Sequence, residues 1–362
     1  MYPNAAPHKL RIAVLFGGRS GEHEVSLMSA RSVLSVLDPA RYEVTQIGIT
    51  HEGTWLTGED AIGSFEQHKL EGLVHYILSP DPSDSKDAPD VFFPVLHGTF
   101  GEDGTIQGLF EMADVAYVGA GVTGSSVGMD KGVFKEVMRA NNIPVVESVL
   151  VLRSAIEKDM NAVIETAERV GAYPIFAKPA NLGSSVGVTK CHNRSDLHEG
   201  LMEAASYDRR VLIERGVTNA REIEVSVLGN DDPVASVCGE ILPSREFYSY
   251  ESKYIDGTSG LEIPAQLPHE TAEQIRAHAV RAYQLIDCAG MARVDFFVEK
   301  DTNKIYLNEL NSIPGFTKIS MYPKLWQASG LSYGALVDRL IELALQRKAE
   351  RDRTLHTYRS QA

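Results

Sequence analysis

Apolar runs of strand length alternate with amphipathic stretches along the first third of the chain. Residues 10–18 (LRIAVLFGG) predict a buried strand, and residues 20–37 carry apolar side chains at helical spacing. A second apolar run over residues 42–50 predicts another strand. Strand, helix and strand in this order are typical of a parallel sheet covered by helices. We therefore expect residues 1–131 to form an N-terminal α/β domain.

The pattern changes after about residue 149. Short strands then follow one another with few long helices between them, at residues 173–178, 186–191, 210–216 and 222–229. This order is typical of antiparallel pairing. Residues 132–230 are therefore predicted to form a central α+β lobe.

The last region, residues 231–362, combines two long helices with one hairpin. Residues 269–286 and 332–347 have the spacing of amphipathic helices. Residues 291–311 predict two strands joined by the polar turn KDTNK. We expect a second α+β lobe here.

The composition is that of a globular protein of two or three domains. Of the 362 residues, 43% are hydrophobic and 23% charged, and the formal net charge is −14. Such an acidic chain lacks the basic footprint for non-specific binding to nucleic acid or to membranes. Its three cysteines form no CxxC pair, and no apolar run has the length of a signal or a membrane span, so a cytoplasmic location is expected. His23, between two glutamates, is expected to be exposed.

The string GSSVG occurs twice, and its first copy is at residues 124–128. Together with Gly119 and Gly121 it completes the GxGxxG pattern of dinucleotide-binding proteins. That fingerprint also needs an acidic residue at the end of the next strand; Glu147 stands at about this distance, but a proline interrupts the strand. A tight turn from strand to helix, capped by one of the two serines, is the favoured interpretation.

The second copy, residues 183–187, has different neighbours. It follows Lys178 at the end of an apolar strand and leads directly into another strand. A loop between two antiparallel strands leaves backbone N–H groups free to converge on an anion, and Ser184 and Ser185 add hydroxyl donors. A phosphate-binding loop and an ordinary glycine-rich hairpin with a surface lysine both fit this stretch.

The hairpin at residues 291–311 brings polar side chains to one face. Arg293 and Asp295 alternate along the first strand, and Glu309 and Asn311 do so along the second. Two carboxylates and an amide oxygen suit Mg²⁺, with room for phosphate oxygens. The alternative is a structural ion pair between the arginine and one carboxylate. Because that pairing leaves the other carboxylate uncompensated, at a cost of about 3–5 kcal/mol, the metal site is favoured.

Eight longer stretches of the sequence carry a more specific signal. They are GGRSGEHEVS, HGTFGEDGTIQG, MDK, KPANLGSSVGV, REIEVSVLG, FYSYESKYID, MARVDFF and NELNSIPGFTKISMYP. In this order they resemble the D-alanine–D-alanine ligase family of the ATP-grasp superfamily, from about residue 11 to residue 347. The resemblance implies an N-terminal parallel-sheet domain followed by a two-lobed ATP-grasp fold that closes on ATP and Mg²⁺.

The resemblance also assigns roles to individual residues. It implies that ATP is held by Lys131, Lys178, Ser185, Glu214 and Glu222. It implies two Mg²⁺ ions, replaceable by Mn²⁺, on Asp295, Glu309 and Asn311. The first D-alanine would be handled by Glu22 and His97, and the carboxylate of the second by Lys253 and Ser320. Arg293 and the Gly315 amide would form an oxyanion site, and Ser184, Tyr254 and Glu22 would link by hydrogen bonds when a loop closes.

The activity implied by the resemblance is ATP-dependent ligation of two D-alanines through an acyl phosphate, for peptidoglycan synthesis. Residues 246–260, polar and rich in tyrosine, would be the lid over the site. Tyr254 favours an amine as the second nucleophile, while D-lactate or D-serine stays open as an alternative second substrate. A nucleotide-binding regulatory module without catalysis and a dehydrogenase are further alternatives. The resemblance also implies a homodimer.

Overall fold

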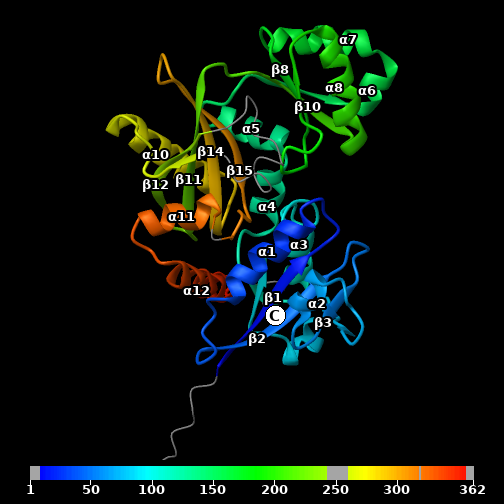
Figure 1. Cartoon of the computed structure of the whole chain (residues 1–362), viewed down its shortest axis with the longest axis vertical. Coiled ribbons are helices and arrows are strands. Elements are labelled where there is room, and N and C mark those ends of the chain that lie inside the picture. Colours follow the sequence, from blue (N-terminus) through cyan, green and yellow to red (C-terminus); the bar gives the residue numbers. More distant parts are fainter. Residues whose placement is uncertain (1–8, 243–259, 318, 356–362) are drawn as a thin grey trace, which may run out of the picture.

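A computed structural model describes residues 9–242, 260–317 and 319–355. These residues form three sheets, and two helices, α4 (Val122–Met129) and α5 (Lys131–Ala140), lie near the middle of the molecule (Figure 1).

The first sheet has six strands in the order β4-β3-β2-β1-β5-β6. Its parallel strands are β1 (Leu10–Gly17), β2 (Tyr42–Ile49), β5 (Val91–Pro94) and β6 (Ala116–Tyr117), which confirms the predicted parallel sheet. Two short antiparallel strands at one edge were not predicted, β3 (Trp55–Thr57) and β4 (Val74–His75). The accompanying helices are α1 (His23–Leu34), α2 (Ala61–Glu66), the 3-10 helix η1 (Pro82–Asp87) and α3 (Thr105–Met112).

The two faces of β1 enter different cores, because side chains alternate along a strand. Ile12 and Val14 pack in one core with α1 and the C-terminal helix α12 (Tyr333–Arg351), whereas Ala13 and Leu15 pack in another with α3. The last helix therefore shares a core with the first sheet, although it follows the third sheet along the chain.

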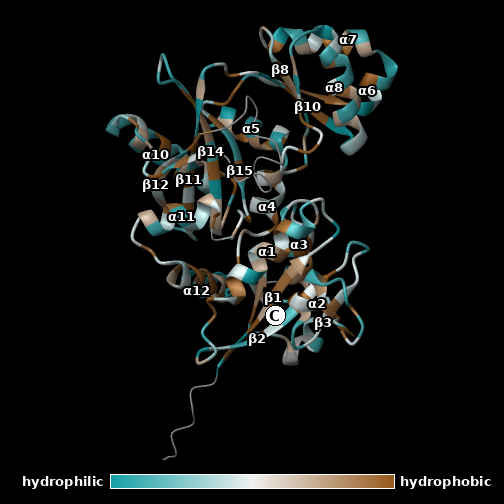
Figure 2. Ribbon diagram, in the orientation of Figure 1, coloured by the Kyte–Doolittle hydropathy of each residue, from teal (hydrophilic) through white to brown (hydrophobic). Residues whose placement is uncertain are grey.

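The second sheet is antiparallel throughout, as predicted. Its strands, in spatial order, are β7 (Ser148–Leu152), β10 (Arg210–Arg215), β8 (Ile175–Pro179) and β9 (Thr189–Cys191). Hydrophobic residues concentrate along strands such as β1 and β10 (Figure 2). The helices here are α6 (Arg153–Lys158), α7 (Met160–Ala167), the 3-10 helix η2 (Glu168–Val170) and α8 (Arg194–Tyr207).

The third sheet contains the predicted hairpin. Its strands, in spatial order, are β13 (Gly260–Glu262), β12 (Val234–Leu242), β11 (Ala220–Gly229), β14 (Gly290–Glu299) and β15 (Ile305–Asn311). Helix α10 (His269–Leu285) packs in the main core of this sheet, and α11 (Met321–Ala328) packs against β12 through Met321 and Leu325.

The first GSSVG copy differs from the sequence prediction. It lies inside α4, which begins at Val122 after Gly121, so neither of its serines caps a helix. A Cβ atom on Gly124 would lie 2.9 Å from the Asp287 carbonyl oxygen, so the glycine permits close packing. The dinucleotide alternative also fails, because the strand after Glu147 is β7, which belongs to the second sheet rather than the first.

Candidate active site

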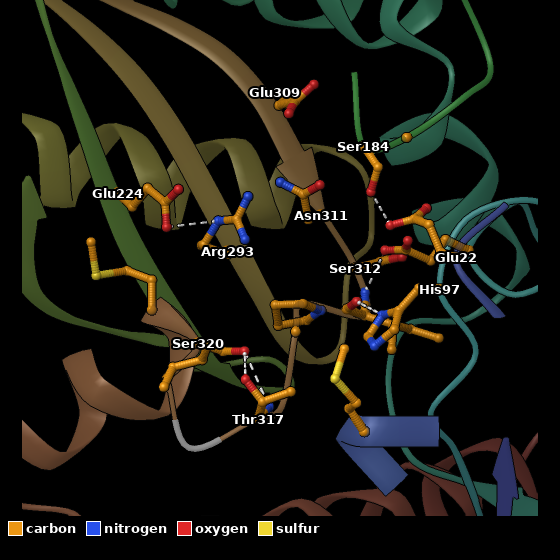
Figure 3. A pocket seen from close by; sticks show the side chains of 18 of the residues that line it. Glu22, His97, Ser184, Glu224, Arg293, Glu309, Asn311, Ser312, Thr317 and Ser320 are labelled. Carbon is orange, nitrogen blue, oxygen red and sulfur yellow. Dashed lines mark hydrogen bonds and ion pairs between the residues drawn. The ribbon is translucent and has the colours of Figure 1, made fainter. Parts of the chain in front are cut away.

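A cavity of about 830 Å³ is lined by residues of helix α1, the loop after β5, the third sheet and the β8–β9 loop. Figure 3 shows ten of its lining residues by name, approaching from several elements. Of the residues singled out from the sequence, it is lined by Glu22, His97, Lys131, Ser184, Arg293, Glu309, Asn311, Gly315 and Ser320. Tyr254 and Lys253 lie outside the described residues.

The polar face of the hairpin forms as predicted. In the register of β14 and β15, Arg293 pairs with Asn311 and Asp295 with Glu309. Arg293 donates to both carboxylate oxygens of Asp295, each at 2.7 Å, and Asn311 donates to Asp295 Oδ2 at 3.0 Å. One step of the sequence argument was wrong: Glu309 is not uncompensated, because Lys131 Nζ lies 3.5 Å from it.

The second GSSVG copy forms the loop between β8 and β9, as expected. Ser184 and Ser185 have φ values of 51° and 60°, so the strained positions of the loop include its serines. The Ser184 hydroxyl donates to the Glu22 carboxylate (Figure 3), which is the expected contact between these residues. A Cβ atom on Gly183 would lie 2.8 Å from Glu22 Oε2, so an alanine here would displace the end of the Glu22 side chain. The loop therefore reaches Glu22 at the beginning of α1.

Two of the residues expected to hold ATP, Lys131 and Lys178, lie beside the same loop. Lys131 Nζ donates to the Leu182 carbonyl oxygen at 2.7 Å, and the Lys178 ammonium group contacts the Glu214 carboxylate. Glu222 lies on β11 in the third sheet. The lysines thus lie beside the loop that was expected to cover the phosphates.

His97 is buried in the wall of the cavity. Its Nδ1 lies 2.9 Å from the Ile313 carbonyl oxygen, so this nitrogen carries the proton, and Nε2 accepts from the Ser29 hydroxyl at 3.0 Å. Burial lowers the pKa of His97, which favours the neutral ring. Both ring nitrogens are therefore engaged by the protein, and His97 orders the wall of the cavity.

Gly315 and Ser320 lie close together in the wall of the cavity. Thr317 donates its backbone N–H to Ser320 Oγ at 3.1 Å, and the hydroxyls of these two residues are 2.8 Å apart (Figure 3). A Cβ atom on Gly315 would lie 2.9 Å from Ser320 Oγ. The loop after β15 thus brings a backbone amide and a hydroxyl to the same wall.

Residues 137–342 match the family described as D-ala D-ala ligase C-terminus, and residues 11–120 match the one described as D-ala D-ala ligase N-terminus. The chain belongs to the D-alanine–D-alanine ligase family.

A D-alanine–D-alanine ligase of Chloroherpeton thalassium is 50% identical over 361 residues, covering 95% of this chain and 98% of the relative. The solved D-alanine–D-alanine ligase from Coxiella burnetii superposes with a TM-score of 0.82 at 36% identity, over 95% of this chain and 96% of that one. A D-Ala:D-Ser ligase from Enterococcus faecalis gives 0.84 at 34% identity, over 93% and 100%. These relatives confirm the ATP-grasp fold expected from the sequence.

Among the described helices, none combines the length and apolar character needed to span a bilayer.

In this family member, the donor set at the hairpin fits a divalent cation. Asp295, Glu309 and Asn311 offer oxygens from one face of two paired strands, which is the ligand type that hard cations prefer. Glu309 and Asn311 also face the cavity, where substrate oxygens would complete the coordination.

Sequence reasoning missed two charged residues that contact this site. Glu224 lies on β11 opposite Asp295, and its carboxylate is 3.0 Å from Arg293 Nε (Figure 3). The sequence did hold a signal for Glu224: it is two positions after Glu222 in a predicted strand, so both side chains point to the same face of the sheet. Glu102 accepts hydrogen bonds from the backbone N–H groups of Gly98 (2.9 Å) and Ile313 (2.8 Å), and so joins the His97 loop to the loop after β15. Burial and the nearby Glu22 raise the pKa of Glu102 to about 8.

The sequence interpretation of His23 was wrong. Its side chain is buried, donates from Nδ1 to the Gly18 carbonyl oxygen at 2.9 Å, and stacks on His51 with ring centroids 3.8 Å apart. His23 therefore supports the turn between β1 and α1, the helix whose first turn follows Glu22.

Proposed function

We propose that the protein joins two molecules of D-alanine into D-alanyl-D-alanine, with ATP converted to ADP and phosphate. The observation that carries this proposal is that Lys131, the carboxylate of Glu309 and Ser184 of the β8–β9 loop all line one cavity. The chain that forms this cavity is a member of the D-alanine–D-alanine ligase family. ATP is the phosphoryl donor, and the reaction uses a divalent metal ion.

In the first step, a carboxylate oxygen of one D-alanine attacks the γ-phosphorus of ATP, and ADP leaves. Negative charge accumulates on phosphoryl oxygens, and we propose that Lys131, Lys178 and Ser185 of the covering loop stabilise it; Lys131 contacts the loop at the Leu182 carbonyl oxygen. We propose two Mg²⁺ ions on Asp295, Glu309 and Asn311, with Mn²⁺ as a substitute; the metal supplies charge neutralisation of the phosphates.

In the second step, the amine of the other D-alanine attacks the acyl phosphate carbon, and phosphate leaves. The carbonyl oxygen becomes an oxyanion in the tetrahedral intermediate. Arg293 and Gly315 both line the cavity, and we propose that the guanidinium group and the Gly315 N–H donate to that oxygen. Because an acyl phosphate hydrolyses in water, the loop contact between Ser184 and Glu22 serves to close the site.

For the amino acids, we propose that Glu22 binds the first D-alanine, with His97 ordering that wall, and that Ser320 and Lys253 bind the carboxylate of the second. D-Serine and D-lactate are not favoured as second substrates. The relatives of about 50% identity carry the D-alanine–D-alanine name, whereas the D-Ala:D-Ser ligase is 34% identical. From the family resemblance we also infer a homodimer, a cytoplasmic location and a place in peptidoglycan precursor synthesis.

The test is phosphate release from ATP with Mg²⁺ in the presence of D-alanine, of L-alanine, and of D-alanine with D-serine or D-lactate. Products are identified by mass. Release with D-alanine alone and a dipeptide product is the expected result. ATP binding without release on D-alanine would contradict the substrate while leaving the nucleotide site intact.

A further inference from the structure

Lys135, Lys178 and Glu214 lie on three different elements and form one buried cluster of charged side chains. Lys135 lies on α5, one helical turn after Lys131, and its Nζ is 2.5 Å from Glu214 Oε1. Glu214 lies on β10, and its other oxygen contacts the ammonium group of Lys178 on the neighbouring strand β8. A single carboxylate is therefore held between two lysines.

The two lysines differ in their access to solvent. The side chains of Lys135 and Glu214 are each 2% exposed, whereas that of Lys178 is 12% exposed. Within the described residues, Lys135 Nζ and Glu214 Oε1 have no hydrogen-bond partner of good geometry, so each depends on the ion pair. Lys178 is thus the more exposed of the two, and it lies near the end of β8, just before the β8–β9 loop, whereas Lys135 is buried on α5.

Burial makes this pairing necessary. Burial lowers the pKa of Lys135, and the Glu214 charge opposes that effect. Burial would also raise the pKa of Glu214, but the two ammonium groups outweigh it and hold that pKa below its ordinary value. A buried carboxylate that loses a counter-ion is strongly destabilised unless another remains.

We infer that Lys135 is a positioning residue of the nucleotide site: it remains the counter-ion of Glu214 when Lys178 turns to the phosphates of ATP. The inference rests on the proposed function, because it takes the anion to be a nucleotide phosphate. Without Lys135, Glu214 would compete with the phosphates for Lys178. Nucleotide affinity would fall, whereas the chemistry at Arg293 would be little changed.

The experiment is a double-mutant cycle on ATP affinity, measured by calorimetry with Mg²⁺. Lys135→Met is expected to raise the Kd for ATP about tenfold or more, because it leaves Glu214 and the phosphates competing for one lysine. In the Glu214→Gln background the same change is expected to alter Kd by less than about threefold, because no buried carboxylate remains. Lys158→Met removes an exposed lysine from α6 and should leave ATP affinity unchanged.

Equal losses from Lys135→Met in both backgrounds would overturn the inference, since a general packing role does not depend on Glu214. If Lys135→Met does not fold, the inference is tested by comparing the Kd for ATP of Glu214→Gln with that of the Lys135→Met, Glu214→Gln double variant. A tenfold difference between these two Kd values would overturn the inference. At saturating ATP, Lys135→Met should change kcat by less than about threefold. Failure of the wild type to make a dipeptide would refute the proposed function, yet ATP binding would still test Lys135.

Discussion

Residues 124–128 and residues 183–187 have the same five side chains in the same order, yet the first copy lies inside helix α4 and the second forms the β8–β9 loop. The first copy has helical backbone and packs against other parts of the chain. The second has positive φ angles at both serines and contacts Glu22. Five residues of small side chains thus do not decide their own conformation.

The flanking structure accounts for the difference. The second copy connects the ends of two antiparallel strands, so its backbone must reverse direction. The first copy follows a short parallel strand, and its glycines allow α4 to approach Asp287 and Leu310. We therefore expect changes in the second copy to affect turnover and changes in the first to affect stability.

The largest expected effect compares two arginines, one in the cavity that the second copy also lines and one beside the helix that contains the first copy. Arg293 lines the same cavity as Gly183 and Ser184 of the second copy, whereas Arg347 lies against Gly121 at the beginning of α4 and pairs with Glu111 at 3.1 Å. Arg293→Ala should lower kcat about 10²–10³-fold, because an oxyanion donor is lost, with ATP affinity retained. Arg347→Ala should cost about 1–3 kcal/mol of unfolding free energy and leave kcat unchanged. Steady-state kinetics, calorimetry and denaturant unfolding test both, and unchanged turnover in Arg293→Ala would remove the oxyanion assignment.

The next effect compares the first serine of each copy. Ser184→Ala removes a hydrogen bond to the Glu22 carboxylate, and a bond of this kind is worth about 1.5–3 kcal/mol, or roughly 10–100-fold in kcat/KM. Ser125→Ala removes only a 3.5 Å contact to the Ala120 carbonyl oxygen and should leave kcat/KM as it is. Equal losses in both variants would show that the second copy has no special part in turnover.

Replacing the first glycine of each copy, Gly124 or Gly183, is expected to have a smaller effect, on stability in the first copy and on turnover in the second. Gly124→Ala places a methyl group 2.9 Å from backbone atoms of Asp287 and Cys288, so we expect a loss of about 1–3 kcal/mol in stability with normal kcat. Gly183→Ala meets only the tip of the Glu22 side chain, so stability should change by less than about 0.5 kcal/mol while turnover falls. Denaturant unfolding and steady-state kinetics on both variants test this prediction. A Gly124→Ala variant with the stability of the wild type would contradict it.

The smallest effect concerns the second serines. Ser126 Oγ donates to the Asp103 carbonyl oxygen at 2.9 Å, and Ser126→Ala should cost about 0.5–1.5 kcal/mol of stability. Ser185→Ala should instead raise KM for ATP by about two- to tenfold, because one neutral hydroxyl donor is lost. A Ser185→Ala variant with wild-type KM would remove this residue from the ATP site.

Local patterns were enough to predict the hairpin with Arg293, Asp295, Glu309 and Asn311, because alternation along paired strands fixes which side chains share a face. They were also enough for the antiparallel β8–β9 loop. Glu224 and Lys135 were missed, because their importance comes from partners on other elements of the fold.

The packing of α12 against the first sheet was missed for the same reason. The first GSSVG copy packs closely against residues more than a hundred positions later in the chain. Contacts of this kind have no signature within a short window of sequence.

The central claim is that an acyl phosphate of D-alanine forms in this cavity. It is tested most directly with D-alanine labelled with ¹⁸O in its carboxylate, followed by mass analysis of the phosphate released with Mg²⁺ and ATP. Because the carboxylate oxygen that attacks ATP leaves with the phosphate, the account predicts one ¹⁸O atom in phosphate for each dipeptide formed. Dipeptide formation with unlabelled phosphate would contradict it.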